Sequence, residues 1–379
     1  MEAVKTSKYF DNLDGLRFIA FLGVFLAHCV ALPNFLSHDH LITRTIWAFC
    51  YNGARGVELF FVISGFIITY LLISEKNKTG DLSLKNFYVR RILRTWPLFY
   101  LIIGYVFLFK PFLFQHGITP SFSFTGNPSG PQSNFWPWIF FIGNYDMMYH
   151  GAPFESELNV LWSLCVEEQF YLFWPIVIKF TKVNKIPYVL GAGVLISIVL
   201  RNAFFGFFQP LGSHLSTLVL LDFFALGGFL AYFISIKEME VRNFMNSSIT
   251  KLTESIFFIG MLLLIAFDTY RNYGLFEKSF KYTFYAILFT VLIVFFEFKT
   301  NSFRWMKSNP FMGYLGKISY GLYMYHMVVW TIVFYYLERY HLSWVMVPMS
   351  LLLTIIISAV SYKFLESPFL NWSRRYRKI

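Results

Sequence analysis

Three polar residues interrupt a long apolar run near the N-terminus, in the stretch DNLDGLRFIAFLGVFLAHC at 11–29. They are Asp14, Arg17 and His28, and a helix that turns about 100° per residue would carry all three on one face. The helical rise of about 1.5 Å per residue puts His28 about 16 Å beyond Arg17, near the middle of a bilayer. Neutral imidazole, with a pKa of about 6.5, is a natural general base, so the pattern favours catalysis at His28. The alternatives are a cytoplasmic anchor for Arg17 and an interhelical hydrogen bond for His28.

A second group of basic residues, Arg90, Arg91 and Arg94, precedes another apolar run in FYVRRILRTWPLFY at 87–100. Helical positions three and four residues apart are neighbours, so at least two of the guanidinium groups would point the same way. Guanidinium binds phosphoryl oxygens bidentately and stays charged, which suits a phosphate-bearing molecule that arrives from the cytoplasm. The alternative is a basic patch that touches lipid headgroups.

Two consecutive carboxylates, Glu167 and Glu168, lie in LWSLCVEEQFYLFWP at 161–175. An ionised side chain within a span costs about 2.5–3.5 kcal/mol or more, so each is by default a functional or pairing residue. Consecutive helical positions point about 100° apart, so the two are not expected to serve one reacting atom. We assign Glu167 to catalysis and Glu168 to acceptor binding or support of the site.

A polar stripe lies in KISYGLYMYHMVVW at 317–330, where Ser319, Tyr323 and His326 would share one helical face. Aromatic packing at the membrane interface explains Tyr320 and Tyr323 equally well, whereas His326 is harder to explain by packing. We assign all four residues to acceptor binding or support of the site.

Two further polar positions lie in apolar stretches. Asp222, at 216–236, is a carboxylate for which the sequence names no partner, and it joins the same supporting group. Ser64, in GARGVELFFVISGFIITYLL at 53–72, is followed by Gly65, and small residues let a helix or a slender ligand approach the backbone closely. Ser64 is therefore assigned to donor binding.

The composition predicts that membrane helices hold these residues. Hydrophobic residues make up 56% of the 379 and charged residues 14%, which differs strongly from the usage of soluble proteins. We expect an all-α, polytopic integral membrane protein. Cys29, Cys50 and Cys165 are too widely spaced to predict a disulfide framework or a metal site.

Ten apolar stretches have about the length of a membrane helix, which needs about 17–25 residues. They lie at 18–36, 57–74, 98–114, 160–178, 187–206, 216–236, 255–270, 280–298, 318–337 and 344–362. An eleventh, WPWIFFIGN at 136–144, is too short to cross, so we expect an interfacial or re-entrant piece there. It belongs to 115–159, which is predicted to be an extracytoplasmic loop.

Loop charges orient these helices. If the N-terminus is inside, the six cytoplasmic segments hold 24 of the 32 Lys and Arg residues, as the positive-inside rule requires. This predicts ten helices, both termini in the cytoplasm and a basic cytoplasmic tail at 367–379. The formal net charge of +11 then reflects topology and contact with anionic lipid, and it does not favour nucleic-acid binding.

Five ordered motifs resemble the acyltransferase-3 family of bacterial integral-membrane O-acyltransferases. They are Arg17 followed after ten residues by His28, GVELFFVISGFII, Arg90-Arg91-x-x-Arg94 with Pro97, WSLCVEEQFYLFWP, and ISYGLYMYH. The resemblance runs from Asp11 to about Pro368. It implies one domain over 1–379, in the stand-alone form without the hydrolase-like domain that some members carry.

The resemblance also implies an activity. Members transfer an acyl group, usually acetyl, from cytoplasmic acyl-CoA to a hydroxyl of an envelope polysaccharide or lipid-linked saccharide. Acetyl-CoA would be the donor substrate, without a metal, at the bacterial plasma membrane. His28 would be the general base, Arg17 with Asp14 would hold or polarise the donor, and Arg90, Arg91 and Arg94 would bind the coenzyme A phosphates.

A proton-coupled transporter or exporter is the alternative from another class, because buried His, Glu and Asp residues also form proton relays. Two features favour the enzyme. No pair of broken helices lies at matching positions in two halves of the sequence, and the arginine cluster faces the cytoplasm.

Overall fold

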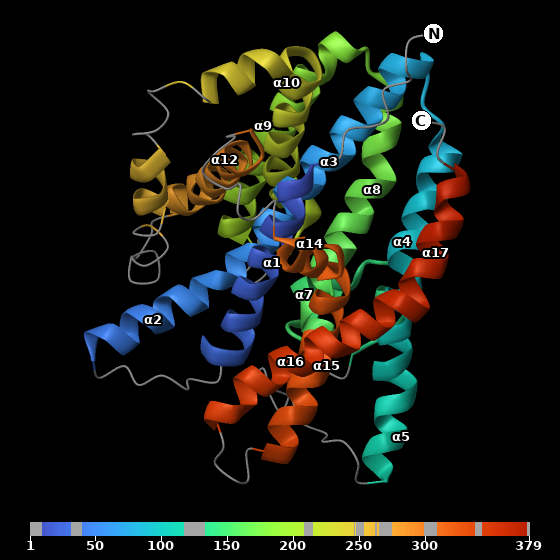
Figure 1. Cartoon of the computed structure of the whole chain (residues 1–379), viewed down its shortest axis with the longest axis vertical. Coiled ribbons are helices and arrows are strands. Elements are labelled where there is room, and N and C mark those ends of the chain that lie inside the picture. The colour runs from blue at the N-terminus through green and yellow to red at the C-terminus, as the bar shows by residue number, and fades with distance from the viewer. Residues whose placement is uncertain are drawn as a thin grey trace.

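The structure is a computed structural model whose described residues form helices joined by turns and short segments, with no strand among them (Figure 1). The described residues are 10–31, 40–116, 133–207, 215–245, 247, 254–261, 264, 275–298, 309–337 and 343–376. The all-α prediction is therefore confirmed for the described part of the chain.

Within the described residues, seven helical segments are long and apolar enough to cross a membrane. They are Asn12–Ala31, Leu41–Thr79, Leu84–Gln115, Val183–Ala203, Thr217–Met245, Phe280–Phe298 and Val345–Tyr376. Each overlaps one of the ten predicted spans. Two more predicted spans coincide with 19-residue helices that carry more polar side chains, α8 (Trp162–Phe180) and α15 (Ser319–Leu337). Half of the predicted span at 255–270 lies outside the described residues, so the count of ten stays a prediction.

Close backbone contacts hold the centre of the bundle together. Helix α3 (Gly56–Thr79) packs against α10 (Leu221–Met245), and a Cβ atom at Gly65 would meet the backbone of Phe224. In the same interface, a Cβ atom at Gly227 would meet the backbone of Val62. Because lipid tails are as apolar as leucine, helices in a membrane associate largely through such close packing.

The N-terminal helix α1 (Asp11–Leu26) continues into a π-helical turn, η1 (Ala27–Ala31). It packs against α3, against α15 and against the short helix α14 (Pro310–Lys317). Figure 1 shows α1 and α14 beside each other near the middle of the molecule, below the turn that joins α3 to α4 (Leu84–Gly104). Asp14 and Arg17 therefore lie inside the bundle.

Three segments that were predicted to lie on one side of the membrane meet at the upper end of Figure 1. The ammonium group of Lys76, at the end of α3, donates hydrogen bonds of 2.7–2.8 Å to three carbonyl groups at the C-terminus of α8. Lys179 of α8 binds Asp81 at 2.9 Å, and Arg90 of α4 donates to the carbonyl of Tyr376 at 2.7 Å. The three Lys76 bonds cap α8, whose last carbonyls would otherwise lack partners.

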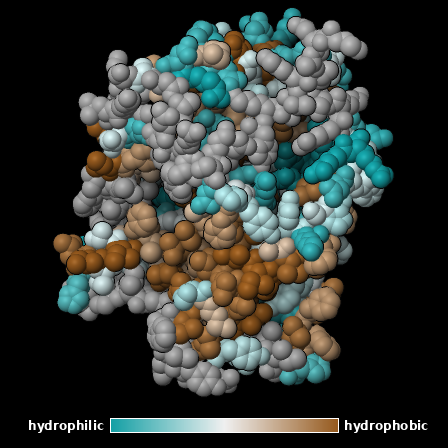
Figure 2. All heavy atoms as spheres, in the orientation of Figure 1, coloured by the Kyte–Doolittle hydropathy of each residue, from teal (hydrophilic) through white to brown (hydrophobic). Residues whose placement is uncertain are grey.

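Apolar side chains cover the outer faces of several helices. On α9 (Ile186–Phe207), Leu195 and Val199 are 65% and 63% exposed. Figure 2 shows apolar residues gathered in the lower half of one face and polar residues toward the upper end. Contiguous apolar surface of this kind is what a lipid-facing protein presents.

Short helices occupy the loop predicted at 115–159. They are α6 (Phe135–Ile139), α7 (Gly143–His150) and η4 (Leu158–Val160), while 117–132 lies outside the described residues. The piece at 136–144 thus contains a five-residue helix, α6, with Trp138 fully buried. The chain also forms a helix that was not predicted, α2 (Leu41–Asn52), ahead of α3. At the other end, α16 (Ser343–Ser361) leads through η8 (Tyr362–Glu366) to α17 (Ser367–Ser373) and η9 (Arg374–Tyr376).

Candidate active site

Two histidines from distant parts of the chain form a direct pair inside the bundle. His28, on η1, places its Nδ1 atom 2.9 Å from Nε2 of His326 on α15, with the two ring planes only 9° apart. Nδ1 of His326 lies 2.6 Å from the backbone carbonyl oxygen of Tyr323. His326 is fully buried and His28 is half-buried. π-Helical turns such as η1 are frequent at functional sites, and this one sets the direction of the His28 side chain.

The Tyr323 side chain anchors the histidine pair to the start of α8. Its hydroxyl donates to the carbonyl of Val160 at 2.9 Å and lies 2.7 Å from Oγ of Ser163. Both Tyr323 and Ser163 are buried, so this polar contact fixes one turn of α15 against η4 and α8. Tyr323 therefore fixes α15 beside the histidine pair, and its predicted part in acceptor binding or support of the site stays a prediction.

The two consecutive carboxylates point to different helices, as the helical geometry predicts. Glu167 accepts hydrogen bonds from Ser64 of α3 at 3.0 Å and from the Tyr171 hydroxyl at 2.8 Å. Glu168 accepts from two residues of α4, the Thr95 hydroxyl at 2.7 Å and the Trp96 indole at 3.1 Å.

Arginines surround this pair of carboxylates. Arg17 of α1 lies within electrostatic range of Asp14, Arg94 and Glu167. The guanidinium of Arg91 lies over the ring of Tyr171, 5.3 Å from its centre, and interacts electrostatically with Glu168. Three helices, α1, α4 and α8, thus bring cations and carboxylates together, and we call Arg17, Arg91, Arg94, Glu167 and Glu168 the charged cluster.

Arg90 points elsewhere. Its guanidinium lies 3.4 Å from the carboxylate of Glu75 and bonds to the carbonyl of Tyr376 in η9. The three arginines of the sequence motif are therefore divided. Arg91 lies near the α8 carboxylates and Arg94 near Arg17 and Glu366, whereas Arg90 lies at the end of the molecule. Arg90 and Arg94 are four residues apart on α4, but their side chains interact with different groups.

The remaining residues of the α15 motif are Tyr320 and Ser319. The Tyr320 hydroxyl donates to the carbonyl of Thr95 at 2.6 Å, which joins α15 to α4. Ser319 is 1% exposed, and its hydroxyl has no hydrogen-bond partner among the described residues.

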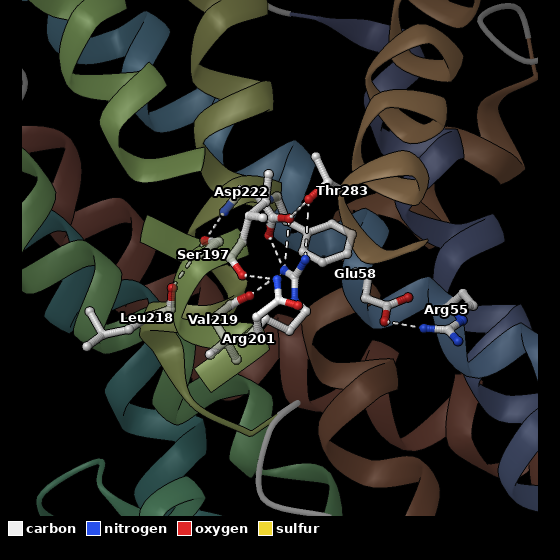
Figure 3. Close-up of polar contacts among 11 residues, drawn as sticks. Arg55, Glu58, Ser197, Arg201, Leu218, Val219, Asp222 and Thr283 are labelled. Carbon is white, nitrogen blue, oxygen red and sulfur yellow. Dashed lines mark hydrogen bonds and ion pairs between the residues drawn. The ribbon is translucent and has the colours of Figure 1, made fainter. Parts of the chain in front are cut away.

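Asp222 lies in a separate network (Figure 3). Its carboxylate forms an ion pair of 2.8 Å with Arg201 of α9 and accepts a 2.6 Å hydrogen bond from Thr283 of α12 (Leu275–Phe298). Arg201 and Asp222 are almost fully buried, and the guanidinium of Arg201 also stacks on the ring of Tyr282. These contacts connect α9, α10 and α12, and the printed sequence alone could not single out Arg201 as the partner.

Three residues that interact with the charged cluster were not predicted from the sequence. Tyr171 lies four residues after Glu167, a helical neighbour spacing that could have revealed it. Thr95 directly follows Arg94 and binds Glu168. Glu366, at the end of η8, is buried and interacts electrostatically with Arg94. It is far from Arg94 along the chain, so no short sequence pattern connects the two residues.

The described residues combine helices with several candidate membrane spans, a buried histidine pair and an internal arginine–carboxylate cluster, which are features of a polytopic membrane protein with an internal polar site. The family model described as an acyltransferase domain (Acyl_transf_3) matches residues 10–363. The chain therefore belongs to the acyltransferase-3 family.

Individual relatives agree with this assignment. A Staphylococcus aureus (strain MRSA252) protein, whose provisional name is O-acetyltransferase, is 28% identical over 403 residues, which cover 98% of this chain and 60% of the relative. Peptidoglycan O-acetyltransferase OatA of Listeria monocytogenes is 26% identical over 391 residues, 98% of this chain and 58% of that protein. O-acetyltransferase OatA of Staphylococcus aureus (strain NCTC 8325 / PS 47) is 27% identical over 394 residues, with 97% and 58% covered.

The chain thus spans about 60% of the length of the curated relatives that it matches. No solved structure gives a significant match to the chain.

Proposed function

We propose that this protein transfers an acyl group, acetyl in the first instance, from cytoplasmic acyl-CoA to a hydroxyl of an envelope saccharide at the bacterial plasma membrane. The observation that carries the proposal is the His28–His326 pair, within a chain of the acyltransferase-3 family. The name of one relative, a peptidoglycan O-acetyltransferase, makes a peptidoglycan hydroxyl the first acceptor to test.

In the proposed reaction, His28 takes the proton of the acceptor hydroxyl while its oxygen attacks the thioester carbonyl carbon. A C–O bond forms and the C–S bond breaks, and the proton passes from His28 to the departing sulfur, which leaves as the free thiol of coenzyme A. No oxidant, reductant or further reactant is needed. General-base catalysis of this kind contributes about 10²–10⁴-fold to the rate.

The charged cluster is the proposed donor side of the site. Arg91 and Arg94 supply guanidinium groups for the phosphates of coenzyme A. Arg17 interacts electrostatically with Arg94 and lies on α1, the helix that leads into η1 and His28. Glu167 is held by Ser64 and Tyr171, so it balances the arginine charges when no phosphate is bound. Arg90 has other partners and contributes less to donor binding.

The proposed orientation has both termini in the cytoplasm and the segment at 115–159 outside. It is supported by the charge of the segments that meet at the upper end of Figure 1, which include Lys76, Lys179 and Arg90. The donor then enters from the end that holds the arginines, and the saccharide enters from the opposite end.

Acetyl-CoA binding to the purified protein, measured by calorimetry, tests the donor side without knowledge of the acceptor. We expect Arg91→Ala to weaken binding by at least about tenfold, the effect of losing one charge-assisted bond. Lys85→Ala is the matched control, because it removes an exposed cation from the first turn of the same helix. No binding by the wild type, together with substrate flux across vesicles, would overturn the proposal in favour of a transporter.

A further inference from the structure

The hydrogen bonds of the histidine pair determine where its protons lie. A carbonyl oxygen can only accept, so the 2.6 Å contact between His326 Nδ1 and the Tyr323 carbonyl requires a proton on Nδ1 of His326. A neutral imidazole carries one N–H, so Nε2 of His326 is an acceptor. The 2.9 Å contact then requires that Nδ1 of His28 be the donor.

The remaining ring nitrogen of His28, Nε2, is then an acceptor. When Nδ1 of neutral His28 carries the proton, Nε2 of His28 carries the lone pair. Within the described part of the chain, His326 is the only hydrogen-bond partner of His28, so its Nε2 is unoccupied by a protein donor. His28 is half-buried, whereas His326 is fully buried, so His28 is the member of the pair that a substrate can reach.

We propose that His326 is a positioning residue that sets the tautomer and ring orientation of His28, so that Nε2 of His28 faces the acceptor hydroxyl as the base. This inference rests on the proposed function. When His28 takes the proton, its Nδ1–H stays bonded to His326, and the surrounding apolar side chains such as Phe21 strengthen that bond. The hydrogen bonds run from His28 through His326 to the backbone carbonyl of Tyr323. This carbonyl has a fixed position because it belongs to the backbone of α15.

Two substitutions of similar size separate this role from simple packing. The side-chain oxygen of glutamine can reach the place of His326 Nε2, so His326→Gln keeps an acceptor for His28. The amide nitrogen of asparagine lies near the place of Nδ1, so His326→Asn keeps the bond to Tyr323 but leaves His28 without its acceptor. Both residues are neutral, polar amides in the same helical position.

The experiment measures acetyl transfer from acetyl-CoA by the purified full chain in lipid vesicles, with peptidoglycan fragments as acceptor. We expect His326→Gln to stay within about tenfold of the wild-type kcat, and His326→Asn to fall about 10–100-fold or more below it, the usual cost of losing an orienting partner. The affinity for acetyl-CoA should be the same in all three proteins, because His326 acts on the reacting histidine. Equal losses in the two variants, or a wild-type rate for His326→Asn, would overturn the inference.

A double-mutant cycle covers the case in which a variant folds poorly. If His326 acts only through His28, then adding His326→Asn to His28→Ala leaves the residual transfer rate unchanged. A further loss by the same factor would show that His326 supports only the packing of the bundle. A wild-type rate for His28→Ala alone would instead refute the proposed function, so the two failures are distinguishable.

Discussion

Asp222 and His28 both lie inside the bundle, but their hydrogen-bond partners give them different roles. The Asp222 carboxylate is neutralised by Arg201 and also bonded by Thr283, which leaves it little capacity to act on a ligand. His28 has one partner among the described residues and keeps a ring nitrogen available. A buried polar residue whose donors and acceptors are all hydrogen-bonded within the protein stabilises the fold. A buried residue with a free acceptor atom is a candidate catalytic residue.

Loss of one partner of the Arg201–Asp222 pair should therefore destabilise the protein. We expect Asp222→Ala to lower the free energy of unfolding by about 3–5 kcal/mol, because it leaves a buried guanidinium unpaired. Chemical unfolding in detergent measures this, with the double variant Arg201→Leu/Asp222→Ala as control, which should recover part of the loss. Normal stability with loss of acetyl transfer would instead support the acceptor-binding role predicted from the sequence.

Asp81 lies in the turn between α3 and α4, outside the spanning segments, and offers a test by pH. A hydrogen bond from Lys179 lowers the pKa of its carboxyl below the usual value. A carboxyl with a lowered folded pKa adds stability above its unfolded pKa of about 3.9, and this stability is lost as the pH falls through the folded value.

We therefore expect Asp81→Asn to lower the thermal midpoint at pH 7, with the difference from wild type disappearing in acid below the folded pKa. Differential scanning calorimetry of the detergent-solubilised protein over this pH series is the measurement. A difference of the same size at every pH would show that Asp81 acts without its charge.

At the scale of elements, apolar runs of spanning length were sufficient to locate most of the helices. The expected spans at 57–74 and 216–236 match α3 and the core of α10, because each run is long and continuous. The sequence did not predict the short helix α2, which lies in the expected loop between two predicted spans. Only the turn at Gly53–Arg55 separates it from α3. The divergence of Glu167 and Glu168 follows from helical geometry alone.

Contacts between elements could not be predicted in the same way. His28 and His326 are 298 residues apart, and their pairing depends on the crossing of α1 with α15. The partners of Asp222 come from α9 and α12. Hydropathy predicts that these segments are helices of spanning length, but it does not predict which side of each helix faces α10. A single sequence therefore predicts the positions of helices well, but it predicts poorly which sides of two helices pack against each other.

The crossing of α3 with α10 gives a prediction at this scale. We expect Gly65→Ala to cost about 1–3 kcal/mol, because the added methyl group would meet the backbone of Phe224, which cannot move independently. Gly104→Ala in α4 is the control, since nothing lies within 4 Å of its added Cβ atom, and it should be neutral or stabilising. Equal unfolding free energies for the two variants in detergent would contradict this close packing.

At the scale of the whole molecule, charge and hydropathy predict how the protein sits in the membrane. The apolar surface on the face shown in Figure 2 and the basic end of the bundle support the proposed orientation, in which the α3–α4 turn is cytoplasmic and α6 is outside. The proposed direction of acyl transfer, from an inner donor to an outer acceptor, depends on this orientation.

Two matched cysteine variants test the orientation. Asn77 at the end of α3 and Asn134 just before α6 are both exposed, and the three native cysteines are buried. We expect a membrane-impermeant maleimide to label Asn134→Cys in intact cells, and to label Asn77→Cys only after the membrane is opened. The reverse pattern would invert the topology and place the arginines on the outer side.

The most direct test of the central claim is single-turnover acetyl transfer by His28→Ala in lipid vesicles, with acetyl-CoA binding measured on the same preparation. We expect a transfer rate at least about 10²-fold below wild type, since a general base is lost, with unchanged affinity for acetyl-CoA. A His28→Ala protein that transfers acetyl groups at the wild-type rate would contradict the account.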